Sequence, residues 1–172
     1  MKLSSKIVLF LLTITSGLVV SCVEKEQYPL EPVIKYAGFM VDTTAEGYDS
    51  LGYVLITYTD GDGDIGLDST DTVEPYLYNY YFTFKAMKNG ILQPIELPDT
   101  AINFNSRIPI LTPSGKNKNI SGEISRTLEL YQAWAFLSSD TIGFEIFIKD
   151  RALNVSNVVQ SPLYIIRRPG KK

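Results

Sequence analysis

The sequence contains no histidine and a single cysteine among its 172 residues. Histidine is the commonest general base and the commonest zinc ligand, so its absence removes two large classes of catalytic site. One cysteine allows no intramolecular disulfide, no cysteine-based zinc cluster and no Cys–His nucleophile pair. A basic surplus is also missing, because 16 Lys and Arg stand against 19 Asp and Glu, for a net charge of −3. That balance argues against nucleic acid as a partner.

The sequence does contain enough apolar residues for a folded domain. Apolar residues make up 45% of the chain and charged residues 20%, which is typical of a globular protein rather than of a disordered tail. A length of 172 residues fits one domain of ordinary size preceded by a short leader.

Residues 1–21 have the composition of an export signal. Lys2 and Lys6 precede an apolar run over residues 7–20, and the first acidic residue is Glu24. As a helix this run would span roughly 21 Å, which is short of the ~30 Å hydrocarbon core of a membrane. We therefore interpret residues 1–21 as a signal peptide rather than as a membrane span.

The apolar run ends in the string Val-Val-Ser directly before the only cysteine, Cys22. This string resembles the lipobox of bacterial lipoprotein signals. The resemblance implies that the Cys22 thiol receives a diacylglycerol, that cleavage occurs just before Cys22, and that the new amine is acylated. A lone cysteine would be a liability in an oxidising compartment unless it is used, and lipidation uses it. The alternatives are an ordinary secretory signal with an incidental cysteine, or an uncleaved anchor.

Residues 22–32 are polar and punctuated by proline, which predicts a short tether. Residues 33–172 form the domain, and their runs of branched and aromatic residues are typical of strands. Strands are expected over residues 33–41, 51–59, 76–87, 91–97, 102–111, 120–130, 142–149 and 157–167, with a hairpin turn at Asn89-Gly90. Only residues 128–137 have a helical spacing, which predicts a short helical plug with Trp134 in the core. We predict an all-β fold, an immunoglobulin-like antiparallel β-sandwich of seven to eight strands.

The most specific motif follows the second expected strand, where residues 60–66 read Asp-Gly-Asp-Gly-Asp-Ile-Gly. The carboxylates of Asp60, Asp62 and Asp64 would repel one another in a compact loop, and the intervening glycines let the backbone wrap sharply. Ca²⁺ binds six to eight oxygens in loops of this kind. The spacing also fits an EF-hand, but Ile65 stands at the glycine position and the flanks read as strands, so we expect calcium without an EF-hand. A solvated Asp-Gly turn is the alternative.

A second polar loop over residues 150–157 contains Asp150 and Asn154. In an immunoglobulin-like sandwich, the connection after the second strand and the connection between the last two strands lie at the same end. We therefore expect Asp150, together with the side-chain oxygen of Asn154, to complete the calcium shell. A polar hairpin turn in which Arg151 pairs with an acid is the alternative.

The acidic string 60–66, the string 150–157 and the lipobox together resemble a set of uncharacterised Bacteroidota outer-membrane lipoproteins. The resemblance covers most of the mature chain. It implies an immunoglobulin-like, calcium-binding outer-membrane lipoprotein without enzymatic activity. The chain has Leu153 where comparable loops often carry glycine.

Two functions are compatible with these features. The first is a lipid-anchored interaction or scaffold module that docks onto other envelope proteins and contains a structural calcium site. The second is a carbohydrate-binding lipoprotein for glycan capture or uptake, with the aromatic residues of 76–84 as a stacking platform. We expect instead that Tyr80, Phe82 and Phe84 fill the core and that Tyr76 and Tyr78 cover its rim. Paired carboxylates could support glycoside hydrolysis, but acids gathered in one glycine-rich loop favour a cation, so no enzyme is expected. The basic C-terminal tail from Arg167 is expected to be solvated.

Overall fold

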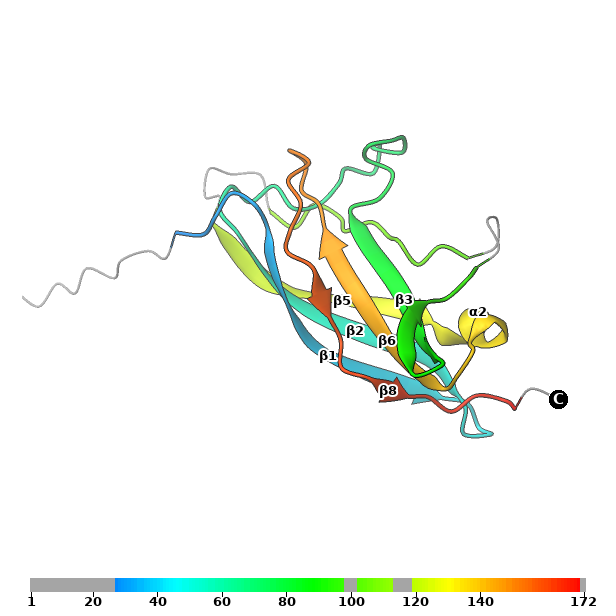
Figure 1. Ribbon diagram of the computed structural model, residues 1–172. Coiled ribbons are helices and arrows are strands. Elements are labelled where there is room, and N and C mark those ends of the chain that lie inside the picture. The colour runs from blue at the N-terminus through cyan, green and yellow to red at the C-terminus, as the bar shows by residue number, and fades with distance from the viewer. Residues whose placement is uncertain (1–26, 98–101, 113–118, 171–172) are drawn as a thin grey trace, which may run out of the picture.

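The computed structural model describes residues 27–97, 102–112 and 119–170. They form two antiparallel β-sheets that pack against each other around one hydrophobic core (Figure 1). The all-β prediction is therefore confirmed. The predicted signal peptide (1–21) and Cys22 lie outside the described residues. Within the described ranges, no helix has both the length and the apolar character needed to cross a membrane.

The first sheet has three strands in the order β1-β2-β5. The strands are β1 (Val33–Thr43), β2 (Asp49–Asp60) and β5 (Ile120–Glu129). β2 is central and pairs along nearly its whole length with both neighbours, so β1 and β5 are the edges of this sheet. Because Val33 pairs with Thr59, the start of β1 and the end of β2 lie at the same end of the molecule.

The second sheet has the order β4-β3-β6-β7, and β8 also pairs with β6. The strands are β3 (Tyr80–Lys88), β4 (Ile91–Pro94), β6 (Thr141–Ile148), β7 (Val159–Gln160) and β8 (Tyr164–Ile165). The expected hairpin joins β3 to β4, with Asn89 and Gly90 at φ values of 54° and 78°. Two consecutive positive φ values are what a tight hairpin turn of this twist requires.

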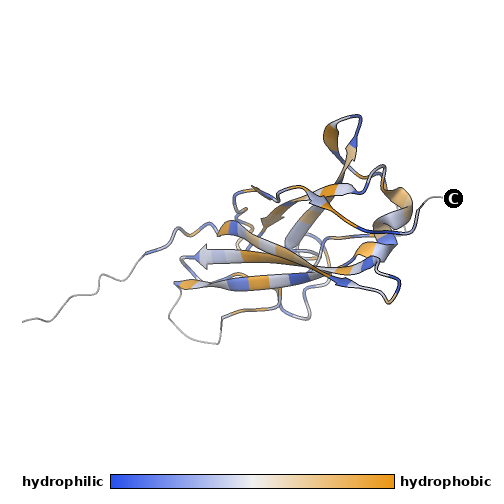
Figure 2. Ribbon diagram, turned by 90° about the horizontal axis from the view of Figure 1, so that it is seen from below, coloured by the Kyte–Doolittle hydropathy of each residue, from blue (hydrophilic) through white to orange (hydrophobic). Residues whose placement is uncertain are grey.

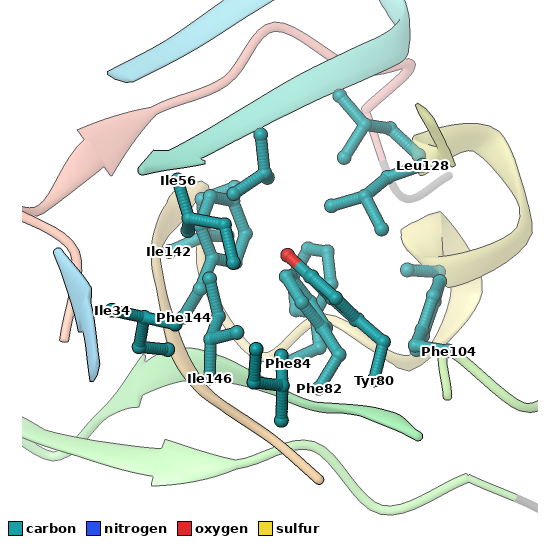
Figure 3. Close-up of a cluster of buried hydrophobic side chains, with 14 of the residues drawn as sticks. Ile34, Ile56, Tyr80, Phe82, Phe84, Phe104, Leu128, Ile142, Phe144 and Ile146 are labelled. Atoms are coloured by element: carbon teal, nitrogen blue, oxygen red, sulfur yellow. The ribbon is translucent and has the colours of Figure 1, made fainter. Parts of the chain in front are cut away.

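The core lies between the two sheets and is built by alternate residues of their long strands, whose bands of high and low hydropathy alternate in Figure 2. Tyr80, Phe82 and Phe84 of β3 are buried there, facing Ile56 and Leu128 of the other sheet (Figure 3). The β3 aromatics thus fill the core, as expected, and do not form an exposed platform.

The predicted helical plug is shorter than its sequence pattern. It consists of α2 (Leu130–Ala133), which continues directly from β5, and the 3₁₀ turn η1 (Trp134–Phe136). Leu130 and Ala133 are buried, and Trp134 packs edge-on against Tyr48 at a ring-centroid distance of 6.1 Å. The plug therefore closes the end of the core opposite the acidic loop (Figure 1).

Residues 102–111 do not form the strand that the sequence predicts. They follow the edge of β3, where side-chain amides take the place of a regular ladder. The Asn79 amide oxygen accepts from the Ile108 N–H at 2.6 Å, and its nitrogen donates to the Ile108 carbonyl at 3.2 Å. The Phe82 N–H donates to the Asn105 amide oxygen at 3.0 Å. Side-chain hydrogen bonds of this kind satisfy the backbone without strand geometry.

The C-terminal tail is held in place by ion pairs at its first two arginines, contrary to the expectation of a free terminus, although the Arg167 side chain stays 63% exposed. Arg167 donates from Nη2 and Nε to the buried carboxylate of Asp49 at 2.8 and 3.2 Å, and its backbone N–H donates to the same group at 2.9 Å. Arg168 donates to Asp140 at 2.7 Å and to the Trp134 carbonyl at 2.9 Å. The tail is thus tied to the end of the molecule that carries α2.

Candidate metal centre

Three aspartates from two distant loops meet at the end of the sandwich where β2 finishes. Asp60 is the last residue of β2, Asp64 lies in the loop that follows, and Asp150 follows β6. One carboxylate oxygen from each lies within 4.8 Å of the others. In Figure 1 the segment after β2 and the loop after β6 occupy the same end of the molecule. The structure therefore brings together three of the five residues that the sequence proposes as ligands.

The separation of these oxygens suits a shared cation. Oxygens bound to one Ca²⁺ at 2.3–2.6 Å lie at most about 5 Å apart, so a limit of 4.8 Å is compatible with a common ion. Asp60 and Asp150 are 0% and 1% exposed. Carboxylates are almost never buried to this degree unless they are paired or coordinate a metal.

Each aspartate of the loop has one oxygen without a protein partner. The Oδ1 atoms of Asp60, Asp62 and Asp64 are all buried and accept no hydrogen bond. The other oxygen of Asp60 accepts from the Asp64 N–H at 2.9 Å, and the other oxygen of Asp64 accepts from the Ala152 N–H at 3.1 Å. The backbone thus fixes one oxygen of Asp60 and one of Asp64, and leaves the second oxygen of each available to a ligand. Unpartnered buried oxygens point to a ligand more specifically than a high content of acidic residues does.

The electrostatics of the cluster are unfavourable in the absence of a cation. Burial raises the pKa of Asp64 to about 6, and repulsion from Asp150, Asp62 and Asp60 adds to this effect. Burial also raises the pKa of Asp60, with repulsion from Asp62 and Asp150 partly offset by the hydrogen bond from Asp64. Both shifts mean that the folded protein disfavours these negative charges, which a bound divalent cation would neutralise.

The two remaining proposed ligands occupy different positions around the cluster. Asp62 is close enough to repel both Asp60 and Asp64, and it contributes one of the unpartnered oxygens. Asn154 donates its backbone N–H to Oδ1 of Asp150 at 2.8 Å and its side-chain nitrogen to Oδ2 at 2.9 Å. Asn154 is therefore placed to orient Asp150, and ligation by its own oxygen stays a prediction.

Arg151 does not neutralise the cluster. Its guanidinium donates to the Gly66 carbonyl at 3.0 Å, and it belongs to none of the ion pairs among the described residues. The arginine instead ties the second loop to the first by a backbone contact. The ion pair that the polar-hairpin alternative gives to Arg151 is therefore not formed among the described residues, although the loop does turn back on itself, with Lys149 bridged to Val155.

Two further acids, Asp68 and Asp71, follow the string 60–66 and form a separate group. Asp68 accepts hydrogen bonds from the N–H and hydroxyl of Thr70, and Asp71 accepts from the Asp68 N–H at 2.9 Å. These carboxylates cap their own exposed turn. An EF-hand would use them as its later metal ligands, so this arrangement agrees with the expectation that the loop is not an EF-hand.

The end of the predicted tether packs against the acidic loop, a contact that the sequence gives no sign of. The Gly61 N–H donates to the Pro29 carbonyl at 2.7 Å, and the Tyr28 N–H donates to Asn119 at 2.9 Å. A Cβ at Gly61 would lie 2.3 Å from the Tyr28 carbonyl oxygen, so glycine is needed there for this approach. The candidate metal centre is thus at the same end as Tyr28 and Pro29, the described end of the predicted tether.

Comparison of the chain with protein-family models, with curated protein sequences and with solved structures gave no match.

Proposed function

We propose that this protein is a non-enzymatic interaction module of the cell envelope, held to the outer membrane by a lipid on Cys22 and stabilised by a structural Ca²⁺. The observation that carries the proposal is the cluster of buried Asp60, half-buried Asp64 and buried Asp150. Beside it stand the unpartnered oxygens of Asp60, Asp62 and Asp64. A cation there would join the loop after β2 to the loop after β6. It would thereby fix the surface that these loops present to a partner protein.

Calcium is the ion that best fits this donor set. All donors are oxygens and the chain has no histidine, which favours a hard cation over zinc or copper. Ca²⁺ accepts six to eight oxygens in flexible geometry, whereas Mg²⁺ demands a near-ideal octahedron and usually keeps several waters. Three aspartates, with Asp62 as a fourth carboxylate, supply the larger and more anionic shell. An affinity in the range of extracellular modules, about 10⁻⁴ to 10⁻³ M, would suit an exported protein.

The strand order supports an immunoglobulin-like assignment. The orders β1-β2-β5 and β4-β3-β6-β7 correspond to A-B-E and C′-C-F-G in immunoglobulin-like sandwiches. In that correspondence the acidic loop is the B–C loop and the loop after β6 is the F–G loop. These are two of the loops through which variable domains of this fold bind their partners.

The lipid anchor would place the metal centre close to the membrane. Cys22 precedes Tyr28 by six positions, and an extended chain spans at most ~3.6 Å per residue. Tyr28 itself lies beside the acidic loop. The calcium-bearing loops would therefore lie within about 22 Å of the lipidated residue, and partners at this end would be membrane proteins or proteins held at the membrane.

Glycan capture is the second candidate, and the structure favours it less. An exposed aromatic face on β3 would have supported it, but Tyr80, Phe82 and Phe84 are buried. Catalysis is disfavoured for a chemical reason. The acids converge on one point, where their mutual repulsion favours binding a cation over the division of roles that hydrolysis requires.

Two measurements test the proposal. Equilibrium dialysis of the purified protein against ⁴⁵Ca²⁺ should give one saturable site. Asp60→Asn should abolish this site, and Glu74→Gln, which removes an exposed acid further along the same connection, should leave it intact. Crosslinking on intact cells should then join the wild-type protein to one or more outer-membrane proteins, and calcium chelation or Asp60→Asn should reduce the yield severalfold. Absence of a saturable site would remove the calcium centre, and an unchanged crosslinking yield would remove its role in binding.

A further inference from the structure

Arg126 is a charged residue on the inward face of an edge strand. Along β5, residues 122, 124, 126 and 128 are the less exposed set, and Arg126 lies between Ile124 and Leu128 on that face. It belongs to none of the ion pairs among the described residues. Its one hydrogen bond in that part of the chain goes from Nη1 to the carbonyl of its neighbour Thr127, and its Nε is buried without a partner.

Tyr80 is a second polar group without a partner in the same region. The side chain is 1% exposed, and its hydroxyl forms no hydrogen bond. In Figure 3 the hydroxyl oxygen points away from β3 into the space between the sheets. Burial raises the pKa of Tyr80, an effect that the charge of Arg126 only partly offsets, so the hydroxyl is protonated at neutral pH. It can therefore donate a hydrogen bond.

The two residues line one pocket at the open side of the sandwich, between β5 and residues 102–111. The pocket has a volume of about 240 Å³, and Ser106, Ile108 and Ile124 also line it. This volume is below the usual range of about 300–1,000 Å³ for drug-sized ligands, so it suits a molecule of only a few heavy atoms. The lining combines an apolar wall with the side chains of Arg126 and Tyr80, whose Nε and hydroxyl lie just behind the pocket surface. It thus matches a small ligand with an apolar body and an acceptor end.

The other charged residues at the pocket do not provide a counter-charge for the Arg126 guanidinium. Arg107 also lines it, but its guanidinium is already bonded to backbone carbonyls of Asp68 and Tyr76, among others. Glu123 lies at the rim, exposed, on the outward set of β5 residues. A guanidinium has five N–H donors and pairs with the two oxygens of a carboxylate. Leaving such a charge partly buried and unpaired is costly, so a counter-charge is expected.

We infer that this pocket binds a small monocarboxylate, whose oxygens accept hydrogen bonds from the Arg126 guanidinium and the Tyr80 hydroxyl while its apolar part packs on Ile108 and Ile124. The site is separate from the aspartate cluster and does not depend on the lipid anchor. A structural role for Arg126 is the competing explanation, because an inward-pointing charge on an edge strand prevents pairing between copies of the chain.

Butyrate is a suitable probe, and butyramide is its neutral counterpart of the same shape. We expect ¹⁵N NMR titration of the purified full chain with sodium butyrate to shift the Arg126 Nε–H resonance saturably, with a dissociation constant in the millimolar range. Sodium chloride at the same ionic strength and butyramide should not. Arg126→Gln should weaken binding at least tenfold and Tyr80→Phe severalfold. Lys35→Gln, which removes an exposed positive charge from β1, should have no effect.

Several results would overturn the inference. They are a butyrate response no larger than that of chloride, equal binding of butyramide, binding of inorganic phosphate in place of butyrate, or unchanged binding in both pocket variants. If Arg126→Gln fails to fold, Tyr80→Phe and the wild-type Nε–H resonance still decide the matter. Self-association of Arg126→Gln, without any carboxylate binding by the wild type, would assign Arg126 to protection of the β5 edge.

Discussion

The carboxylate of Asp64 accepts a hydrogen bond of 3.1 Å from the backbone N–H of Ala152, 88 positions further along the chain. The Asp64 carbonyl also accepts from the Arg151 N–H at 3.3 Å. These contacts fix the acidic loop to the loop after β6 without any metal. The loops are thus positioned in advance. The free energy needed to bring the three carboxylates together comes from folding rather than from binding the ion.

Calcium should raise the melting temperature of the wild-type protein. Binding to the folded state alone stabilises by RT ln(1 + [L]/Kd), about 1.4 kcal/mol when calcium is tenfold above Kd. For a domain of this size that corresponds to a shift of roughly 3–6 °C. Asp60→Asn should erase the shift, because it replaces the unpartnered oxygen by an amide nitrogen while the other oxygen can still accept from Asp64. Thermal melts with calcium and with chelator measure this.

In the absence of calcium, Asp60→Asn should have the opposite effect on stability. Asp60→Asn removes one negative charge from a group that repels itself, so its calcium-free melting temperature should exceed that of the wild type. Glu74→Gln is the control, since it removes an exposed acid of the connection between β2 and β3 that lies outside the cluster. A calcium shift of equal size in Asp60→Asn and the wild type would contradict the assignment of the site.

The stability of the calcium-free protein should depend on Asp64 between pH 4 and 6. The pKa of Asp64 is raised from 3.8 to about 6, so over this interval the folded state holds a proton that the unfolded state has lost. Stability should therefore fall as the pH rises from about 4 to about 6 and level off above it. Urea unfolding in calcium-depleted buffers should show this slope, and Asp64→Asn should reduce it. A slope of the same size in Asp64→Asn would show that another group causes it.

Much of the fold could be predicted because its signals are local. The alternation in β2, β5 and β6 needs only residues two positions apart, and Asn89-Gly90 marks its hairpin by backbone preference alone. The acidic loop could also be found locally, from aspartates that alternate with glycines. Predicting Asp150 as a ligand required the further assumption that two distant loops share one end of a sandwich. The meeting of Asp60, Asp64 and Asp150 supports that assumption.

What could not be predicted depends on contacts between distant parts of the chain. Residues 102–111 have strand-like composition, but the Asn79 side chain takes the hydrogen bonds that a neighbouring strand would have offered. In the sequence, the tail from Arg167 looks like an ordinary basic terminus. Only the structure shows that Asp49 lies beside Arg167. Arg126 can be located from the sequence, because the alternation of β5 places it among inward residues. A single charged residue does not change the apolar pattern of a strand, so the pattern alone does not single it out.

Cys22→Ser should abolish lipid labelling and release the protein from membranes. Serine supplies no thioether, so two or more acyl chains, each contributing about 0.8 kcal/mol per buried methylene, would be lost. The variant should fold normally, because Cys22 precedes the tether and the core begins at Ile34. Metabolic labelling with a radioactive fatty acid and membrane fractionation measure the two effects. Retention of the variant in membranes after a high-salt wash would contradict the lipoprotein assignment.

Leu153 occupies the left-handed backbone region in the loop after β6, with φ of 67°. The turn therefore has the conformation that glycine would favour, although the residue is leucine. Leu153→Gly should be more stable than Leu153→Ala by about 1 kcal/mol, because both variants remove the side chain and only alanine keeps the backbone strain. Urea unfolding of the two variants under identical conditions measures the difference. Equal stabilities would show that this turn stores no strain.

Gly66→Ala should be among the most damaging substitutions in the acidic loop. A Cβ at this position would lie 2.2 Å from the Pro109 carbonyl oxygen, and the backbone φ of 110° disfavours any side chain. Gly47 separates these two causes, because it has a positive φ of 82° and nothing within 4 Å of its Cβ position. Gly47→Ala should therefore cost only the backbone strain, about 1 kcal/mol.

Gly66→Ala should cost a further 1–3 kcal/mol, the usual range for overpacking, as the loop moves away from residues 109–110. Since Arg151 donates to the Gly66 carbonyl, this movement should also disturb the second loop and weaken calcium binding, whereas Gly47→Ala should leave calcium binding unchanged. Urea unfolding and ⁴⁵Ca²⁺ dialysis of both variants measure the two effects. If Gly66→Ala loses stability but binds calcium as the wild type does, the aspartate cluster is independent of the close contact at Gly66, and the two loops are coupled through Asp64 alone.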